Sequence, residues 1–150
     1  MPEKATIERA RRDARQGKAP STQAGEFVRE EIHHVREGKH GARSTKQAIA
    51  IGLSKARRAG VSLPPPKKGR ASARTRKQAA RDNRKGQHRT AKPSSRRSRA
   101  VTRALKREHR SAASHRALAR QAKRSARTRS RADRQRAAKR AARTRRSHRS

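Results

Sequence analysis

Two amphipathic helices are predicted by residues 21–61, STQAGEFVREEIHHVREGKHGARSTKQAIAIGLSKARRAGV. The first has an apolar stripe with spacings of three and four residues, made by Ala24, Val28, Ile32 and Val35, with Phe27 beside it. Such spacing is typical of a helix with one buried face. We expect this helix over 22–37, with Ser21 or Thr22 as its N-cap and Gly38 closing its end.

The second helix is expected over 45–59. Ser44 and Gln47 fit the capping box S-x-x-Q at its start, and Gly60 followed by Val61 fits a C-cap glycine with its apolar partner. Its buried stripe is predicted to consist of Ile49, Gly52, Leu53 and Ala56, with Ala48 and Ile51 alongside. The two helices form an αα-hairpin over about 22–59.

This hairpin has too few large apolar residues to be stable alone, because ordering its backbone costs about 1–2 kcal/mol per residue. A further helix over 2–16, a second copy of the chain or a ligand is needed to complete its core. We therefore expect a small helical region over 1–63, with a Pro-rich linker over 64–69 beginning at Pro64-Pro65-Pro66.

Residues 70–150 form a basic arm of low complexity. From Pro64 to the end the chain has 33 Lys or Arg against three acids, a net charge of +30. The large aliphatic residues beyond Leu63 are only Val101, Leu105 and Leu118. A segment with so much like charge and so little to bury is expected to be disordered, or helical only on binding. The predicted fold class is mostly α with extensive disorder.

A polyanion is the partner that such an arm requires, and duplex DNA is the first expectation. The chain has one aromatic residue, Phe27, so it lacks the stacking platforms of single-strand binders. Phosphate contacts independent of sequence are what remain, with DNA compaction as a nucleoid-associated protein. The candidate binding residues are Arg57, Arg58, Arg74, Arg76, Lys77, Arg96, Arg97, Arg99, Arg103, Lys106, Arg107, Lys123, Arg124, Arg127, Arg129, Arg131, Lys139, Arg140, Arg143, Arg145 and Arg146.

Other functions remain open as alternatives. The arm could thread into folded RNA as a ribosome-associated protein does, and the hairpin could dock a protein partner or form a homodimer. A helix-turn-helix is disfavoured because the connector over 38–43 exceeds the three or four residues of that motif.

Catalysis, cofactors and metals are not predicted. No phosphate-binding glycine motif occurs, and no serine has an acid–base partner in an apolar pocket. His33 and His34 are adjacent, so on a helix they point about 100° apart, and a metal site, which would need further ligands converging on one face, is disfavoured. They are expected to pair with Glu37 and Glu30, one turn away.

The chain has no cysteine, which fits a reducing compartment. Its longest uncharged stretch of note, over 47–54, is far too short to span a membrane. A cytoplasmic protein associated with the nucleoid is therefore expected.

Two resemblances accompany this interpretation. Residues 18–61 resemble a family of small, basic, uncharacterised bacterial proteins, some of which are labelled DNA-binding or histone-like. The Arg, Lys, Ala, Ser and Pro composition after PPPKKG (64–69) resembles the tails of linker-histone-like bacterial proteins. The resemblance implies a bacterial source and DNA binding, and it supplies no catalytic residue.

Overall fold

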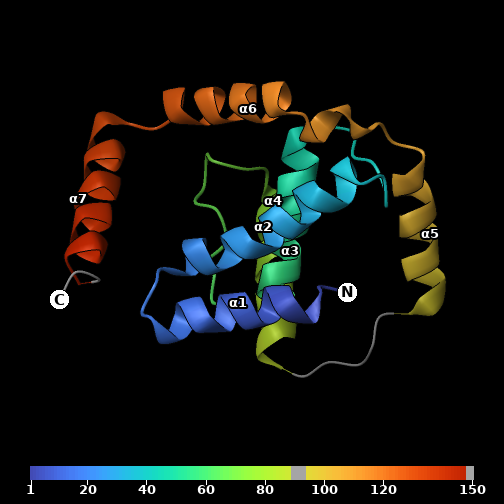
Figure 1. Ribbon diagram of the computed structural model, residues 1–150, viewed down its shortest axis with the longest axis horizontal. Coiled ribbons are helices and arrows are strands. Elements are labelled where there is room, and N and C mark those ends of the chain that lie inside the picture. The colour runs from blue at the N-terminus through green and yellow to red at the C-terminus, as the bar shows by residue number, and fades with distance from the viewer. Residues whose placement is uncertain (89–93, 148–150) are drawn as a thin grey trace. The chain divides into compact units, whose positions relative to one another are not determined.

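The computed structural model describes residues 1–88 and 94–147, and its regular structure there is helical (Figure 1). The helices are α1 (Lys4–Arg15), α2 (Pro20–Arg36), α3 (Thr45–Arg58), α4 (Ala73–Gln87), α5 (Ser95–Lys106), the 3-10 helix η1 (Arg110–Ala113), α6 (His115–Arg127) and α7 (Arg131–Ser147). The chain divides into two compact units, the first ending at Ser114 and the second beginning at His115.

Both helices of the predicted hairpin are present as α2 and α3, which pack against each other. Helix α2 begins at Pro20, so the prediction of an N-cap at Ser21 or Thr22 is wrong. Proline suits the first position of a helix because its φ is already helical and its missing N–H would have no partner there.

Three helices end at a glycine in the left-handed conformation. Gly17, Gly38 and Gly60, which follow α1, α2 and α3, have φ of 68°, 77° and 95°. After α3, the amide of Val61 donates to the Ala56 carbonyl at 3.1 Å, the long bond of a Schellman motif. The predicted C-cap at Gly60 is therefore confirmed.

The start of α3 confirms the predicted cap at Ser44. The Ser44 Oγ accepts from the Gln47 amide at 3.2 Å. The Gln47 side chain departs from a standard capping box, because its Oε1 accepts from the amide of Arg43 at 2.7 Å instead of that of Ser44.

Small residues, not large ones, form the most buried line of α3. Thr45, Ala48, Gly52 and Ala56 are buried, whereas Ile49 and Leu53 are only partly so. At Gly52 an added Cβ would lie 2.6 Å from the Val28 Cα, so α2 and α3 meet backbone to backbone. The predicted stripe was therefore rotated on the helix, and its large members lie at the edge of the contact.

The hairpin is completed by the chain's own helices. Helix α1 packs along α2, as Figure 1 shows, and α4 packs on α3. The main apolar cluster contains Ala10, Ala24, Phe27, Ala56 and Val61, with Ile7, Leu53 and Leu63 packed against it. The requirement for additional structure is thus met within one chain.

The prediction of extensive disorder is wrong. Helices α4, α5, α6 and α7 occupy most of the described part of the basic arm. The arm has few large apolar side chains to hold it, but polar side chains and backbone close approaches hold α4 instead. Ala and Arg are also strong helix formers, and that propensity outweighs like-charge terms of about 0.2–0.5 kcal/mol per pair.

The end of α5 and the segment that follows it dock on the connector between α2 and α3. The amides of Gly41 and Ala42 donate to the carbonyls of Leu105 and His109 at 2.9 and 3.1 Å. A Cβ at Gly41 would overlap the Glu108 carbonyl oxygen, so only glycine permits this approach. The connector therefore joins the hairpin to residues of the arm.

The second unit contains α6 and α7. In α7 the Ser130 Oγ caps the helix by accepting from the Asp133 amide at 3.1 Å, and Asp133 pairs with Arg136 at 2.6 Å. Among the residues that the structure describes, no helix is long and apolar enough to cross a membrane.

Candidate nucleic-acid interface

Helix α4 is anchored to α3 by a buried carboxylate. Asp82 is 1% exposed and accepts from the Ser54 hydroxyl at 2.7 Å, the Arg58 guanidinium at 2.8 Å and the Gln78 amide at 3.1 Å. One turn on, Gly86 approaches the Arg57 carbonyl so closely that a Cβ would overlap it. These contacts fix which face of α4 is turned outward.

The outward face of α4 is a row of cations. Five exposed side chains form it: Arg74, Lys77, Arg81, Arg84 and Lys85. With 100° per residue they fall within an arc of about 100°, and they extend over about 16 Å of helix axis. The helix's single acid, Asp82, lies outside this arc and is turned toward α3, and within residues 1–88 and 94–147 none of the five makes an ion pair. We call these five residues the α4 cationic face.

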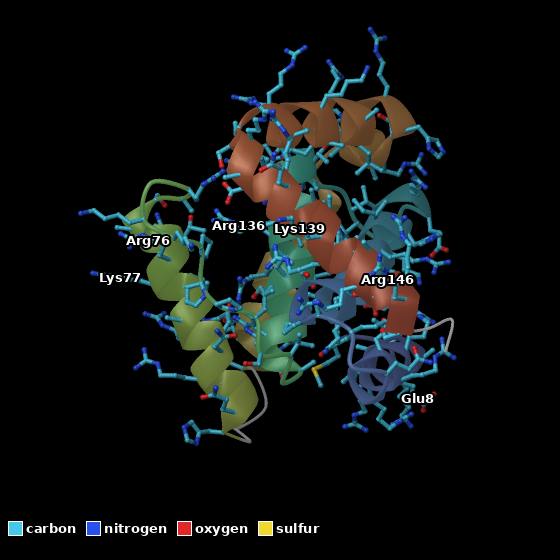
Figure 2. The ribbon with its side chains drawn as sticks, turned by 90° about the vertical axis from the view of Figure 1, so that its left-hand side faces the viewer. Glu8, Arg76, Lys77, Arg136, Lys139 and Arg146 are labelled. Carbon is cyan, nitrogen blue, oxygen red and sulfur yellow. The ribbon has the colours of Figure 1, made fainter. Side chains whose placement is uncertain are left out.

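The outer face of α1 is different, because an acid lies among its cations. Glu8 shares that face with Arg11, Arg12 and Arg15, and all four are exposed. Figure 2 labels Glu8 on α1 and Lys77 on α4, where Lys77 projects outward. A uniform positive face is thus a property of α4 and not of every helix in the unit.

Helix α5 has a similar arrangement. Arg96, Arg99, Arg103 and Lys106 are exposed and fall within about 80° of its circumference, whereas Arg97 lies apart from them. Val101, 54% exposed, belongs to the opposite side of α5. Arg107 follows as the C-cap of the helix.

In the second unit α6 is cationic on one side only. Its five exposed cations fall within about 100°: Arg116, Arg120, Lys123, Arg124 and Arg127. The opposite side has the partly buried Ala117, Leu118, Gln121 and Ser125. Helix α7 has its cations spread around most of its circumference, among them Arg136, Lys139 and Arg146 in Figure 2.

Most of the sequence-predicted binding residues are at the surface. The exposed ones are Arg58, Arg74, Lys77, Arg96, Arg97, Arg99, Arg103, Lys106, Arg107, Lys123, Arg124, Arg127, Arg129, Arg131, Lys139, Arg140, Arg143, Arg145 and Arg146. Of these, Arg58 is engaged by Asp82. Arg76, which was also predicted, is half-buried and therefore is not among the exposed residues.

Arg57 is placed in the interior. It is 7% exposed, and its guanidinium donates to the Leu63 carbonyl at 3.1 Å and to the Pro64 carbonyl at 3.3 Å. Burial lowers the pKa of this guanidinium, while the charge of Asp82 acts in the opposite direction. Arg57 holds the chain that leaves α3, and its charge is not offered to a ligand.

Sequence reasoning missed several members of these faces: Arg81, Arg84, Lys85, Arg116 and Arg120. The helical periodicity that identified the hairpin also relates them to their neighbours. No helical face was predicted for the arm because its low complexity indicated disorder. The clustering itself was therefore readable, but the burial of Asp82 was not.

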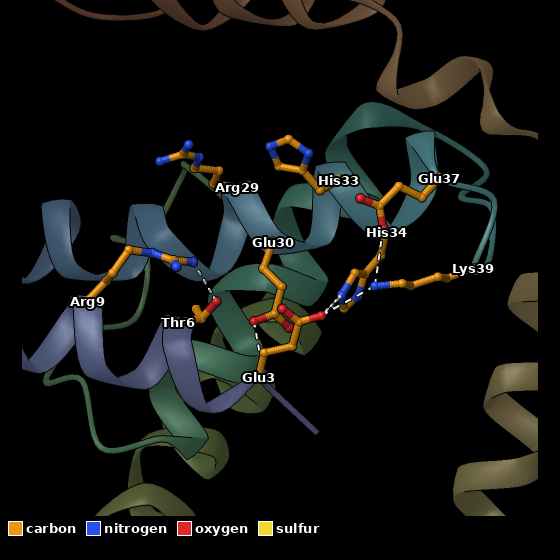
Figure 3. A pocket seen from close by; sticks show the side chains of 9 residues that line it. All are labelled: Glu3, Thr6, Arg9, Arg29, Glu30, His33, His34, Glu37 and Lys39. Atoms are coloured by element: carbon orange, nitrogen blue, oxygen red, sulfur yellow. Dashed lines mark hydrogen bonds and ion pairs between the residues drawn. The ribbon is translucent and has the colours of Figure 1, made fainter.

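A second polar region lies between α1 and α2, where a cavity of about 290 Å³ is lined by three acids and three cations as well as other polar residues (Figure 3).

His34 Nε2 lies 2.9 Å from Glu3 Oε1, so the predicted pairing of His34 with Glu30 is wrong, and Figure 3 shows His33 pointing away. His34 and then Lys39 hold the pKa of Glu3 below its ordinary value, and Glu37 raises that of Lys39. The three acids and three cations of this lining are equal in number, which leaves no net charge to attract an anion.

Comparison with known proteins adds a family match to this picture. No curated protein and no solved structure matches the chain. Residues 3–68, which include α1, α2 and α3 but not the α4 cationic face, are similar to a family of unknown function (DUF6496).

Proposed function

We propose that the protein binds duplex nucleic acid, with DNA as the expected partner, through phosphate contacts independent of sequence. The observation that supports this most is the α4 cationic face, five exposed cations on a helix whose one acid is buried against α3. Each strand of a duplex presents one phosphate per about 3.4 Å of axis, so a row of about 16 Å spans four or five phosphates.

The burial of the chain's single aromatic residue supports recognition of the nucleic-acid backbone and not of its bases. The one aromatic residue of the chain, Phe27, is 1% exposed and belongs to the core. Single-strand binding and base reading in RNA depend on exposed aromatic platforms. A rigid row of guanidinium and ammonium groups needs only phosphates at a regular spacing.

Compaction of DNA is the expected consequence in the cell. The α4 cationic face belongs to the first unit and the cationic side of α6 to the second, so one chain offers two separate groups of cations. Joined binding modules raise overall affinity through their effective concentration, and they can hold two stretches of duplex. Such binding would place the protein on chromosomal DNA.

The test compares two triple variants of the full-length chain. In one, Arg74, Lys77 and Arg81 of α4 are changed to Gln; in the control, Arg11, Arg12 and Arg15 of α1 are changed to Gln. Both remove three exposed cations, so the net charge of the two variants is identical. Affinity for a duplex DNA is measured by fluorescence anisotropy over a series of salt concentrations.

The α4 variant should make the negative slope of log K against log salt shallower by about 2.7, since each of the three lost phosphate contacts contributes about 0.9. The α1 control should change the slope by much less, because Glu8 already offsets its face. Equal slopes for both variants would contradict the assignment of α4. Stronger binding of folded RNA than of DNA at every salt concentration would replace DNA with RNA as the partner.

A further inference from the structure

A buried cluster outside the cationic faces contains two histidines and a glutamate. Glu31 and His34 are three residues apart on α2 and therefore project from the same face of the helix. His40 reaches them from the connector, after the turn at Gly38. One ligand atom from each of Glu31, His34 and His40 lies within 4.8 Å of the others.

The carboxylate of Glu31 has one oxygen without a hydrogen-bond partner. Its side chain is 0% exposed; Oε2 accepts from Lys55 Nζ at 2.6 Å, but Oε1 is buried with no hydrogen bond among the described residues. His40 Nε2 lies 3.3 Å from this Oε1 without forming a hydrogen bond to it. Such an orphaned buried oxygen is costly unless a cation or a proton occupies the space beside it.

The charges around the cluster do not balance. Glu30 and Glu31 are 2% and 0% exposed in their side chains, and both lie against a single cation, Lys55, at 3.6 and 2.6 Å. Two carboxylates against one ammonium leave one negative charge in a nearly dry site unless a bound cation or a proton on the neighbouring His40 balances it. A buried uncompensated charge requires a counter-charge close by.

The ring of His40 is oriented as a ligand. Its Nδ1 lies 3.0 Å from the Gly41 carbonyl oxygen, which can only accept, so Nδ1 bears the proton that donates there and Nε2 is the ring nitrogen that faces Glu31. A hydrogen bond from the far ring nitrogen to a backbone carbonyl is how metal-binding histidines are commonly fixed. The His34 and His40 rings stand edge to face, with centroids 6.1 Å apart.

We propose that Glu31, His34 and His40 form a binding site for a divalent metal ion of the zinc class. Two imidazole nitrogens with one carboxylate oxygen are a common zinc ligand set, with a water completing the coordination. The ion would tie α2 to the connector whose Gly41 and Ala42 receive the segment after α5. Its role is structural: it braces the joint between the hairpin and the arm.

The test uses the full-length protein, freed of metal by a chelator and of nucleic acid by high salt. Zn²⁺ is titrated in competition with a chromophoric chelator, and the Co²⁺ form is examined for the intense visible bands of a four-coordinate ion. The variants are Glu31→Gln, which keeps the shape of the side chain, and His40→Ala. His33→Ala is the matched control, because His33 is exposed and adjacent to His34.

One tight Zn²⁺ per chain is expected, with a rise in melting temperature on binding. Glu31→Gln and His40→Ala should each weaken Zn²⁺ binding by about tenfold or more, with His33→Ala leaving it unchanged. Far-UV circular dichroism shows whether each variant is folded. Equal affinity of all four proteins, or a His40 imidazolium that keeps its Nε2 proton in ¹⁵N spectra with Zn²⁺ present, would overturn the proposal. DNA binding plays no part in either readout.

Discussion

Changing Gly52 to Ala tests the close approach of α2 and α3, on which the first unit depends. The added Cβ would lie 2.6 Å from the Val28 Cα and 3.0 Å from the Phe27 carbonyl oxygen. Both are backbone atoms, so no side chain can rotate to make room and the helices must separate. We expect a packing cost near the upper end of the usual range for an overfilled core, about 3 kcal/mol.

The same substitution at Gly25 supplies the control. Gly25 is an exposed residue of α2, and an added Cβ there would meet no atom within 4 Å beyond its own stretch of helix backbone and its chain neighbours. Replacing glycine by alanine inside a helix stabilises it by about 1 kcal/mol, a gain common to both sites. The expected net effects are therefore about 2 kcal/mol of destabilisation for Gly52→Ala and about 1 kcal/mol of stabilisation for Gly25→Ala.

Urea denaturation followed by circular dichroism measures both free energies of unfolding. A difference of about 3 kcal/mol between the two variants is expected, and 1 kcal/mol corresponds to about 4 °C in melting temperature for a unit of this size. If Gly52→Ala proved as stable as Gly25→Ala, the helices could not be in backbone contact at Gly52, and the small-residue packing of α3 would be refuted.

Two further perturbations address the polar contacts. Asp82→Ala removes the acceptor of the Ser54 and Arg58 bonds, and should destabilise the first unit by about 2 kcal/mol while amide hydrogen exchange in α4 becomes faster; unchanged exchange in α4 would show that Asp82 does not anchor it. Glu3, whose pKa is lowered by His34, stabilises the fold above its ordinary pKa, and this contribution is lost as the pH falls through the lowered value. Glu3→Gln should therefore reduce stability near neutral pH and have no effect in strong acid, which urea titrations at the two pH values would check; an equal loss at both would mean that the charge of Glu3 is not involved.

The hairpin was predictable because its information is local. Helix periodicity, the Ser44 cap and the Gly60 terminus each involve residues a few positions apart, and all three agree with the structure. The orientation of α3 was not predictable from size alone. Its most buried residues are small, since a glycine at position 52 allows the backbones of α2 and α3 to touch, which moves Ile49 and Leu53 to the edge of the contact.

For the candidate sites, too, some features could be predicted from local sequence and others depend on tertiary packing. The sequence by itself determined that the chain has a large excess of cations and, through helical spacing, that those of α4 and α6 gather on one side of each helix. Only the tertiary structure decided that Asp82 is turned inward and that His40 lies beside Glu31. The physical reason is that charge and periodicity are properties of a segment, whereas burial and the meeting of side chains depend on which segments pack together.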